Sequence, residues 1–153
     1  MLSELLNLQA IRIPLEARTK DEALRELVEV LERAHGIDTD GDVLSRVVRR
    51  ESMMSTGIGN GVAIPHGKSR LVERLASACA VAPGGLDFDS VDGEPATLFI
   101  LLVSPENVRG PHVKALASIS RLMKEETVRE SLRTAASAEA FMQTLRDAES
   151  RFL

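Results

Sequence analysis

The sequence predicts one α/β domain over residues 1–153, built as a sandwich of helices around a mostly parallel or mixed sheet. Two near-continuous apolar runs, 76–82 and 96–103, are typical of strands covered on both faces, and we place them at the centre of the sheet. Apolar residues at helical spacing occur before and after these runs. With 153 residues and 44% hydrophobic content, the chain is long enough for one core and too short for two ordinary enzyme domains.

The start of the chain predicts a short strand and then a helix. Apolar and polar residues alternate over 11–15, which indicates a strand with one buried face, and Pro14 places it near a sheet edge. The segment Thr19–Glu22 is a capping box, and apolar residues follow it at helical spacing over 23–31. We expect this helix to end at Gly36.

A second helix is expected immediately afterwards. Either Asp40 or Asp42 is suited to cap it, and its apolar stripe covers 43–48. Its last turn carries Arg49, which we expect to be solvated, and Arg50. Arg50 therefore lies just before a glycine-rich segment.

The remaining elements follow from turn residues and helical spacing. Segments 83–85 and 92–95 predict turns, with 86–88 forming a short strand or a surface ridge. Three helices are predicted in the last third, with apolar positions over 113–123, 128–132 and 141–145, and Ser137 caps the last one.

Composition argues against a nucleic-acid partner. The formal net charge is -4 and the pI is near 5.4, whereas a protein that binds phosphate backbones normally presents a basic face. The chain has four Phe and neither Trp nor Tyr, so few side chains are available for base stacking. Cys79 is the only cysteine, which excludes an intrachain disulfide, and its apolar neighbours indicate a small buried residue.

The sequence predicts a cytoplasmic protein without membrane insertion. The first seven residues are interrupted by polar side chains and carry no basic leader, so no signal peptide is expected. The longest strongly apolar run, 98–103, is far shorter than the roughly 20 residues needed to span a bilayer.

The glycine-rich segment Ser55–Gly67 leads directly to His66. Gly57, Gly59 and Gly61 allow backbone conformations that other residues resist. We therefore expect a flexible loop that presents the imidazole of His66 to a reacting group.

Known nucleotide and metal motifs do not account for this segment. Gly61–Ser69 is one residue too long for a phosphate-binding P-loop, and Pro65 removes a backbone donor that such a loop needs. In the dinucleotide pattern, Val62 stands where the third glycine belongs. No nucleophile elbow and no pair of histidines at zinc-ligand spacing are found. Those four enzyme classes therefore lose their usual evidence.

Two histidines are the candidate reactive groups. A neutral imidazole at His66 offers a lone pair to phosphorus, and the alternative is a turn histidine that only hydrogen-bonds its own loop. His112 follows Gly110–Pro111 at a helix start, where it either contacts phosphate or only caps the helix. Arg50 is equally explained as a solvated charge at a helix end, and His35 by the dipole of its helix.

The chain resembles a known family over essentially its whole length. Its segments Arg50–Glu51, Ser55–Gly61 and Ala63–Gly67 closely resemble the enzyme IIA domains of the bacterial phosphoenolpyruvate-dependent phosphotransferase system, in their fructose/mannitol and nitrogen-regulatory type. The segment His112–Leu116 resembles the second histidine motif of that family. The resemblance implies a mixed five-stranded sheet with helices on both faces.

The resemblance also implies roles for three residues. His66 would accept a phosphoryl group from a histidine phosphocarrier protein, His112 would donate a hydrogen bond to phosphoryl oxygens, and Arg50 would supply positive charge. Such a transfer is catalysed mainly by positioning and preorganised donors, so the resemblance implies no cofactor and no metal.

The glycine-rich segment is more similar to the nitrogen-regulatory and fructose types than to the mannitol type. The leading hypothesis is a regulatory carrier whose phosphorylation state is read by target proteins. One alternative is a fructose-type enzyme IIA that passes phosphate to a separate IIB domain for sugar uptake. The other is a non-catalytic binding module with a vestigial site.

Overall fold

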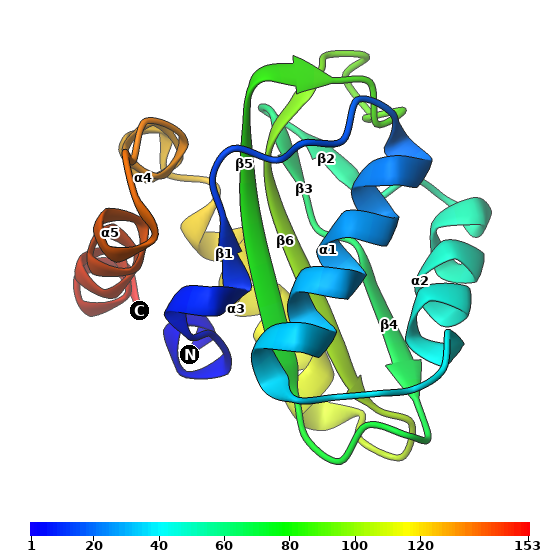
Figure 1. The fold of residues 1–153 in the computed structure, drawn as a ribbon. Helices are drawn as coiled ribbons and strands as arrows, with labels where there is room; N and C mark the ends of the chain where they lie inside the picture. The colour runs from blue at the N-terminus through cyan, green and yellow to red at the C-terminus, as the bar shows by residue number, and fades with distance from the viewer.

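Two long antiparallel strands, β5 (Ala76–Leu86) and β6 (Ala96–Pro105), form the centre of the fold in the computed structural model, which describes residues 1–153 (Figure 1). Cys79 lies opposite Ile100 in their register, and both residues are fully buried. Because both faces of these strands are covered, almost every side chain in them is apolar. The two predicted central strands are confirmed.

The sheet contains six strands in the order β1-β5-β6-β3-β2, and β4 also pairs with β6. At one edge β1 (Ile11–Arg12) is parallel to β5, and at the other β2 (Gly57–Gly59) is antiparallel to β3. β3 (Val62–Ala63) and β4 (His66–Ser69) run parallel to β6 one after the other, so the six strands fill five positions. The predicted mixed sheet is confirmed.

Pro65 explains the break between β3 and β4. A proline has no backbone N–H and cannot donate to the neighbouring strand. Its carbonyl still accepts a hydrogen bond from the backbone N–H of Leu102 at 3.1 Å, so the chain stays aligned with β6. His66 therefore begins β4 directly opposite Leu102.

Helices lie on both sides of the sheet (Figure 1), as predicted. On one face are α1 (Lys20–His35) and α2 (Asp42–Met53). On the opposite side and beside the edge strand β1 are α3 (Gly110–Leu122), α4 (Glu126–Arg133) and α5 (Ala138–Phe152), and two short 3-10 turns, η1 (Leu2–Leu5) and η2 (Leu8–Ala10), precede β1. None of the helices combines the length and the apolar character needed to cross a membrane.

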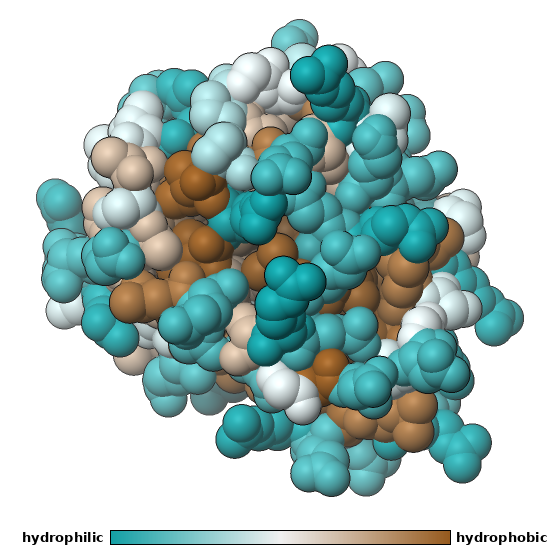
Figure 2. All heavy atoms as spheres, in the orientation of Figure 1, coloured by the Kyte–Doolittle hydropathy of each residue, from teal (hydrophilic) through white to brown (hydrophobic).

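The amphipathic pattern of α1 explains how it packs. Its buried side chains all face the sheet, and they are Ala23, Leu24, Leu27, Val28 and Leu31. Polar side chains cover most of the outer surface on this side of the molecule (Figure 2). Each fully buried leucine stabilises the fold by about 1.5–3 kcal/mol relative to an exposed one.

Three predicted helix boundaries are confirmed. The hydroxyl of Thr19 accepts a hydrogen bond from the backbone N–H of Glu22 at 3.2 Å, and Gly36 ends α1 in the left-handed conformation with φ of 64°. At α5, the hydroxyl of Ser137 accepts from the backbone N–H of Ala140 at 3.1 Å. Both helices therefore begin at the capping residues that the sequence indicated.

The predicted cap of α2 is wrong. Neither Asp40 nor Asp42 caps the helix with its side chain, since the N-cap position is Gly41. The backbone N–H of Val43 instead donates to the hydroxyl of Thr39 at 3.1 Å. The carboxylate of Asp42 accepts a hydrogen bond from the hydroxyl of Ser69 on β4 and so connects the helix to the sheet.

The predicted turn at 83–85 is also wrong. β5 continues through these residues, and its pairing with β6 shifts register between Val81 and Leu86. Gly85, with φ of 71°, accommodates this bulge. The adjoining Phe88 forms no surface ridge, because its ring is fully buried against Phe99 with the two centroids 5.6 Å apart.

Two further predictions were too broad. Of the predicted 11–15 strand, Ile11–Arg12 alone is regularly paired with β5, at the sheet edge, and Leu15 adds one backbone hydrogen bond to Val81 at 2.8 Å. Val113, placed on the apolar stripe of its helix, is 63% exposed. It directly follows a buried histidine, so this position belongs to the outer face of α3.

Candidate active site

His66 is half-buried at the first position of β4. Its Nδ1 lies 2.9 Å from the backbone carbonyl oxygen of Ile64. A carbonyl only accepts hydrogen bonds, so Nδ1 carries the ring proton. In the neutral ring this leaves the lone pair on Nε2.

The surroundings of His66 favour the neutral ring. Partial burial lowers its pKa below the ordinary value of 6.5, and the nearby charge of Arg50 lowers it further. The hydrogen bond to Ile64 and the charge of Glu51 oppose this change and raise the pKa. Because the net direction is downward, the ring of His66 is neutral at pH 7.

His112 lies beside His66 although the two are far apart in the sequence. The ring centroids are 5.7 Å apart and the ring planes are tilted by 58°. The hydroxyl of Ser104 lies 2.6 Å from Nδ1 of His112. Burial, followed by the charge that His66 carries when protonated and by the charge of Lys68, lowers the pKa of His112 to about 4, so this ring is also neutral at pH 7.

Two elements bring His112 to this place. β6 ends at Pro105 beside β4, and α3 begins at Gly110. His112 is therefore in the first turn of a helix, where backbone N–H groups have no partner inside the helix. Such a helix start favours a bound anion.

Arg50 lies in the last turn of α2, across from the histidines. Its Nη1 donates a hydrogen bond to the carbonyl oxygen of Met54 at 3.0 Å, which ties the guanidinium to the end of its own helix. Arg50 lines the same depression as both histidines, and its charge lowers the pKa of His66. The three predicted site residues, His66, His112 and Arg50, therefore converge on one place.

An open depression of about 390 Å³ contains these residues. Its lining comprises Arg46, Arg49, Arg50, Met53, His66, Gly67, Lys68 and His112. The lining thus holds four cationic side chains and no carboxylate. No group of three or more His, Cys, Asp or Glu side chains that could hold a metal ion occurs in the structure. The charge of the depression suits an anion.

Sequence reasoning missed several of these lining residues. Lys68 follows His66 by two positions on a strand, which places both side chains on one face. Arg46 precedes Arg50 by one helical turn. Arg49 was expected to be solvated, and it is exposed while still bordering the depression. The spacing of Lys68 from His66 and of Arg46 from Arg50 could have identified both residues as site residues from the sequence.

The prediction for the glycines is confirmed in part, since Gly59 and Gly61 adopt backbone conformations that other residues resist, but they do not form a loop around His66. A Cβ at Gly57 would lie 2.8 Å from the Cα of Ser90, so this glycine permits close packing of two backbones. Gly59 and Gly61, with φ of 95° and 77°, form the turn between β2 and β3. The Gly61 carbonyl accepts from the backbone N–H of Thr97 on β6, whereas His66 lies opposite Leu102, so the turn is about 16 Å from His66 along the strand direction. The histidine is therefore presented by a strand of the sheet, and the expectation of a flexible glycine loop is wrong.

The chain belongs to the family described as "Phosphoenolpyruvate-dependent sugar phosphotransferase system, EIIA 2", whose model matches residues 4–148. A nitrogen regulatory protein of Bradyrhizobium diazoefficiens is 34% identical over 144 residues and 94% of both chains. The fructose-specific EIIABC component of Bacillus subtilis is 34% identical over 141 residues and 92% of this chain, which spans 22% of that relative's length. The predicted family is confirmed.

Solved structures agree with this assignment. The crystal structure of nitrogen regulatory protein IIA-Ntr from Neisseria meningitidis is similar with a TM-score of 0.87 at 34% identity, covering 94% of this chain and 97% of that one. The mannitol enzyme IIA of Escherichia coli, in its complex with phosphorylated enzyme IIB, gives a TM-score of 0.78 at 23% identity, covering 93% and 97%. The second similarity concerns the fold alone.

Proposed function

We propose that this protein is a phosphoryl carrier of the nitrogen-regulatory type, which accepts a phosphoryl group on Nε2 of His66 and signals through its phosphorylation state. The supporting observation is the bond from Nδ1 to the Ile64 carbonyl, which leaves Nε2 as the free nitrogen of a neutral ring. The cationic depression around this ring suits the charge of a phosphoryl group.

The donor in this proposal is a histidine phosphocarrier protein that docks over the depression. The lone pair of Nε2 attacks phosphorus, a bond from phosphorus to Nε2 of His66 forms, and the bond to the carrier's ring nitrogen breaks and returns its electron pair to the carrier. Charge on the phosphoryl oxygens is stabilised by Arg50 and by a hydrogen bond that His112 donates. Neither a metal nor a nucleotide takes part.

The state of His66 then has consequences for partner proteins. A phosphohistidine adds a doubly charged group to a surface that holds four cationic side chains. Regulatory target proteins in the cytoplasm would read this change in charge. The 34% identity to nitrogen regulatory proteins, one of them with a TM-score of 0.87, favours this output.

A second candidate function is a fructose-type enzyme IIA that passes the group to a IIB domain for sugar uptake. Equal identity to a fructose-specific component supports it. The two candidates share the chemistry at His66 and differ in the recipient. Transfer from the phosphorylated protein to a purified fructose IIB domain within seconds would favour this candidate.

Reconstitution tests the shared chemistry. The purified protein is incubated with phosphoenolpyruvate, enzyme I and the phosphocarrier, and acid-labile phosphate on the chain is measured. We expect labelling of the wild type and of His35→Ala, and none of His66→Ala. An unlabelled wild type would favour a binding module with a vestigial site, and a labelled His66→Ala would exclude His66 as the acceptor.

A further inference from the structure

We propose that Glu51 and Thr56 are positioning residues, which orient the ring of His66 and fix its proton on Nδ1 by holding the backbone of Thr56 and Ile64 in place. This inference extends the proposed function, since it names what prepares the accepting nitrogen. It concerns side chains that lie outside the depression and do not touch a phosphoryl group there.

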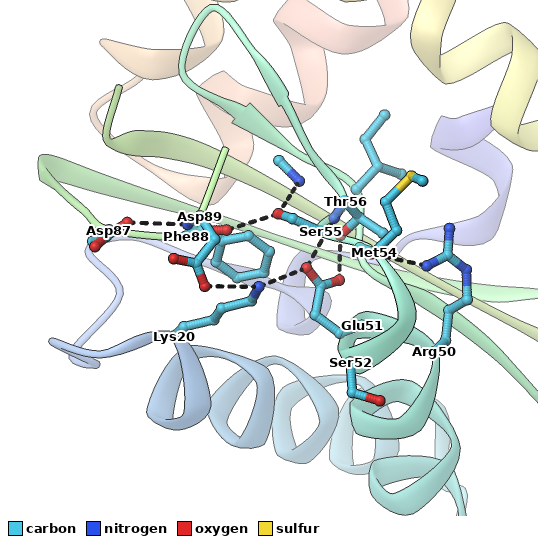
Figure 3. A network of polar contacts seen from close by, with 12 residues as sticks. Lys20, Arg50, Glu51, Ser52, Met54, Ser55, Thr56, Asp87, Phe88 and Asp89 are labelled. Atoms are coloured by element: carbon cyan, nitrogen blue, oxygen red, sulfur yellow. Dashed lines mark hydrogen bonds and ion pairs between the residues drawn. The ribbon is translucent and has the colours of Figure 1, made fainter. Parts of the chain in front are cut away.

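A continuous chain of hydrogen bonds connects these residues. The backbone N–H and the hydroxyl of Thr56 donate to the two carboxylate oxygens of Glu51, at 2.8 and 2.5 Å (Figure 3). The carbonyl of Thr56 accepts from the backbone N–H of Ile64 at 3.0 Å. The carbonyl of Ile64 accepts from Nδ1 of His66 at 2.9 Å. Hydrogen bonds thus hold the backbone of Thr56 and of Ile64 on both sides, between the carboxylate and the imidazole.

The carboxylate at the start of this chain is held rigidly. Glu51 is only 5% exposed, and the ammonium group of Lys20 lies 3.1 Å from its Oε1 (Figure 3). Lys20 is itself placed by Asp89 at 3.4 Å and by the ring of Phe88, whose centroid lies 4.8 Å away. The ion-pair partner and the two hydrogen-bond donors compensate the loss of solvent around this carboxylate.

The location of Glu51 is unfavourable unless it has such a role. It lies in the last turn of α2, where the helix dipole repels negative charge, and it is removed from solvent. A residue that breaks a local rule in this way calls for a compensating gain. The gain here is that the carboxylate fixes Thr56 by two hydrogen bonds. Thr56 in turn fixes the Ile64 carbonyl, which accepts the hydrogen bond from Nδ1 of His66.

The chain also suits the chemistry at the ring. The N–H and the carbonyl of one residue belong to different peptide groups, so Glu51 acts on the Ile64 carbonyl by holding the backbone in place. Positive charge develops on the ring of His66 when Nε2 bonds to phosphorus, and a well-placed acceptor at Nδ1 stabilises it. The charge of Glu51 also raises the pKa of His66, which likewise favours a positively charged ring. Two adjacent residues of α2 thus act on the two reacting groups: Arg50 acts on the phosphoryl group and Glu51 acts on the ring of His66.

Three variants separate positioning from simple stabilisation. Glu51→Gln removes the charge, Thr56→Val removes the hydroxyl donor, and Thr56→Ser restores it. Thr97→Val is the matched control, because the hydroxyl of Thr97 donates to the Gly61 carbonyl of the neighbouring turn at 3.3 Å and takes no part in the chain. Urea unfolding reports the stability of each.

The first readout is the tautomer of His66, measured by proton–nitrogen correlation NMR of the ring. We expect the wild type, Thr56→Ser and Thr97→Val to hold the proton on Nδ1, and Glu51→Gln and Thr56→Val to populate the other tautomer. In Glu51→Gln we also expect a lower pKa of His66, since a charge that raises it is gone. A wild-type ring with its proton on Nε2 would overturn the inference even if every variant unfolded.

The second readout is labelling by phosphoramidate, which needs no partner protein. The bond from its phosphorus to its nitrogen breaks, ammonia leaves, and the bond to Nε2 of His66 forms. We expect Glu51→Gln and Thr56→Val to react about tenfold more slowly, a typical contribution of groups that orient a functional histidine, and Thr56→Ser and Thr97→Val to react at the wild-type rate. Folded variants with wild-type tautomer and rate would overturn the inference.

Results that contradict the positioning role can be distinguished from results that contradict the proposed function. A wild type that takes phosphate from neither the phosphocarrier nor phosphoramidate contradicts the proposed function, while the tautomer measurement still tests the chain of hydrogen bonds. Slower labelling of Glu51→Gln with an unchanged tautomer and an unchanged pKa of His66 contradicts the positioning role alone.

Discussion

The hydroxyl of Ser104 lies 2.6 Å from Nδ1 of His112, and both side chains are buried. Ser104 is the penultimate residue of β6 and His112 the third residue of α3, so this hydrogen bond connects the central strand to the helix that follows it. When the hydroxyl donates, the proton of the neutral ring is on Nε2. His112 is then prepared to donate a hydrogen bond from that nitrogen.

Replacing Ser104 by alanine is expected to affect both stability and transfer. A buried ring nitrogen without a partner costs about 1–3 kcal/mol of unfolding free energy. Loss of the fixed tautomer slows phosphoryl transfer about tenfold. Ser77→Ala is the control, because this buried hydroxyl donates to the Leu101 carbonyl at 2.6 Å, away from the depression. It should lose stability and keep the transfer rate, and equal slowing of both variants would refute the role of Ser104.

Stability should depend on pH through His112. The unfolded ring gains a proton near pH 6.5 and the folded ring only near pH 4, so the unfolded state binds more protons between these values. The contribution is complete above pH 6.5 and decreases as the pH falls towards 4, by up to about 1.4 kcal/mol per pH unit. His112→Gln should therefore show a shallower pH dependence in urea titrations. An unchanged slope would contradict the lowered pKa.

Close packing at Gly67 should matter for the site. A Cβ at this position would lie 3.1 Å from Cγ2 and 3.3 Å from the backbone nitrogen of Val47 on α2. Gly67→Ala forces α2 away from β4, which costs about 1–3 kcal/mol, and it moves Arg50 relative to His66, which slows transfer. Gly84→Ala, where a Cβ meets nothing within 4 Å, should change stability by less than about 0.5 kcal/mol. Equal effects in the two variants would show that this contact is unimportant.

The guanidinium of Arg50 should act on the reaction more than on folding. Its one side-chain hydrogen bond is to the Met54 carbonyl at an exposed helix end. Arg50→Ala should slow transfer about a hundredfold, leave unfolding nearly unchanged, and raise the pKa of His66 in an NMR titration, because a charge that lowers it is removed. The exposed neighbour Arg49, changed to alanine, should show a smaller effect. An unaltered pKa of His66 would place Arg50 outside the site.

Local sequence patterns predicted most of the fold. Apolar runs identified β5 and β6, and capping residues identified the starts of α1 and α5, because these signals need only neighbouring residues. The prediction of the α2 cap was wrong because Thr39, Asp40 and Asp42 are all suited to cap the helix. The tertiary hydrogen bond from Ser69 engages Asp42, and Thr39 accepts the bond from the helix start. The prediction of a turn at 83–85 was wrong because long-range pairing with β6 overrides the local turn preference of these residues.

The main side chains of the candidate site could be predicted from the sequence, but the residues that support them could not. His66 and His112 stood out as isolated functional groups, whereas Ser104 lies in an apolar run with nothing to distinguish it. Its relation to the site arises from the register in which Lys68 on β4 lies opposite Ser104 on β6. The chain from Glu51 to His66 likewise depends on the bond between Thr56 and Ile64, which joins two segments that no periodicity connects.

The position of the phosphoryl group tests the proposed chemistry most directly. Phosphorus–nitrogen correlation NMR of the protein, labelled by the phosphocarrier system, identifies the nitrogen that is bonded to phosphorus. We predict phosphorus on Nε2 of His66, with the proton of Nδ1 still hydrogen-bonded to the Ile64 carbonyl. Phosphorus on Nδ1 of His66 or on His112 would contradict the proposal.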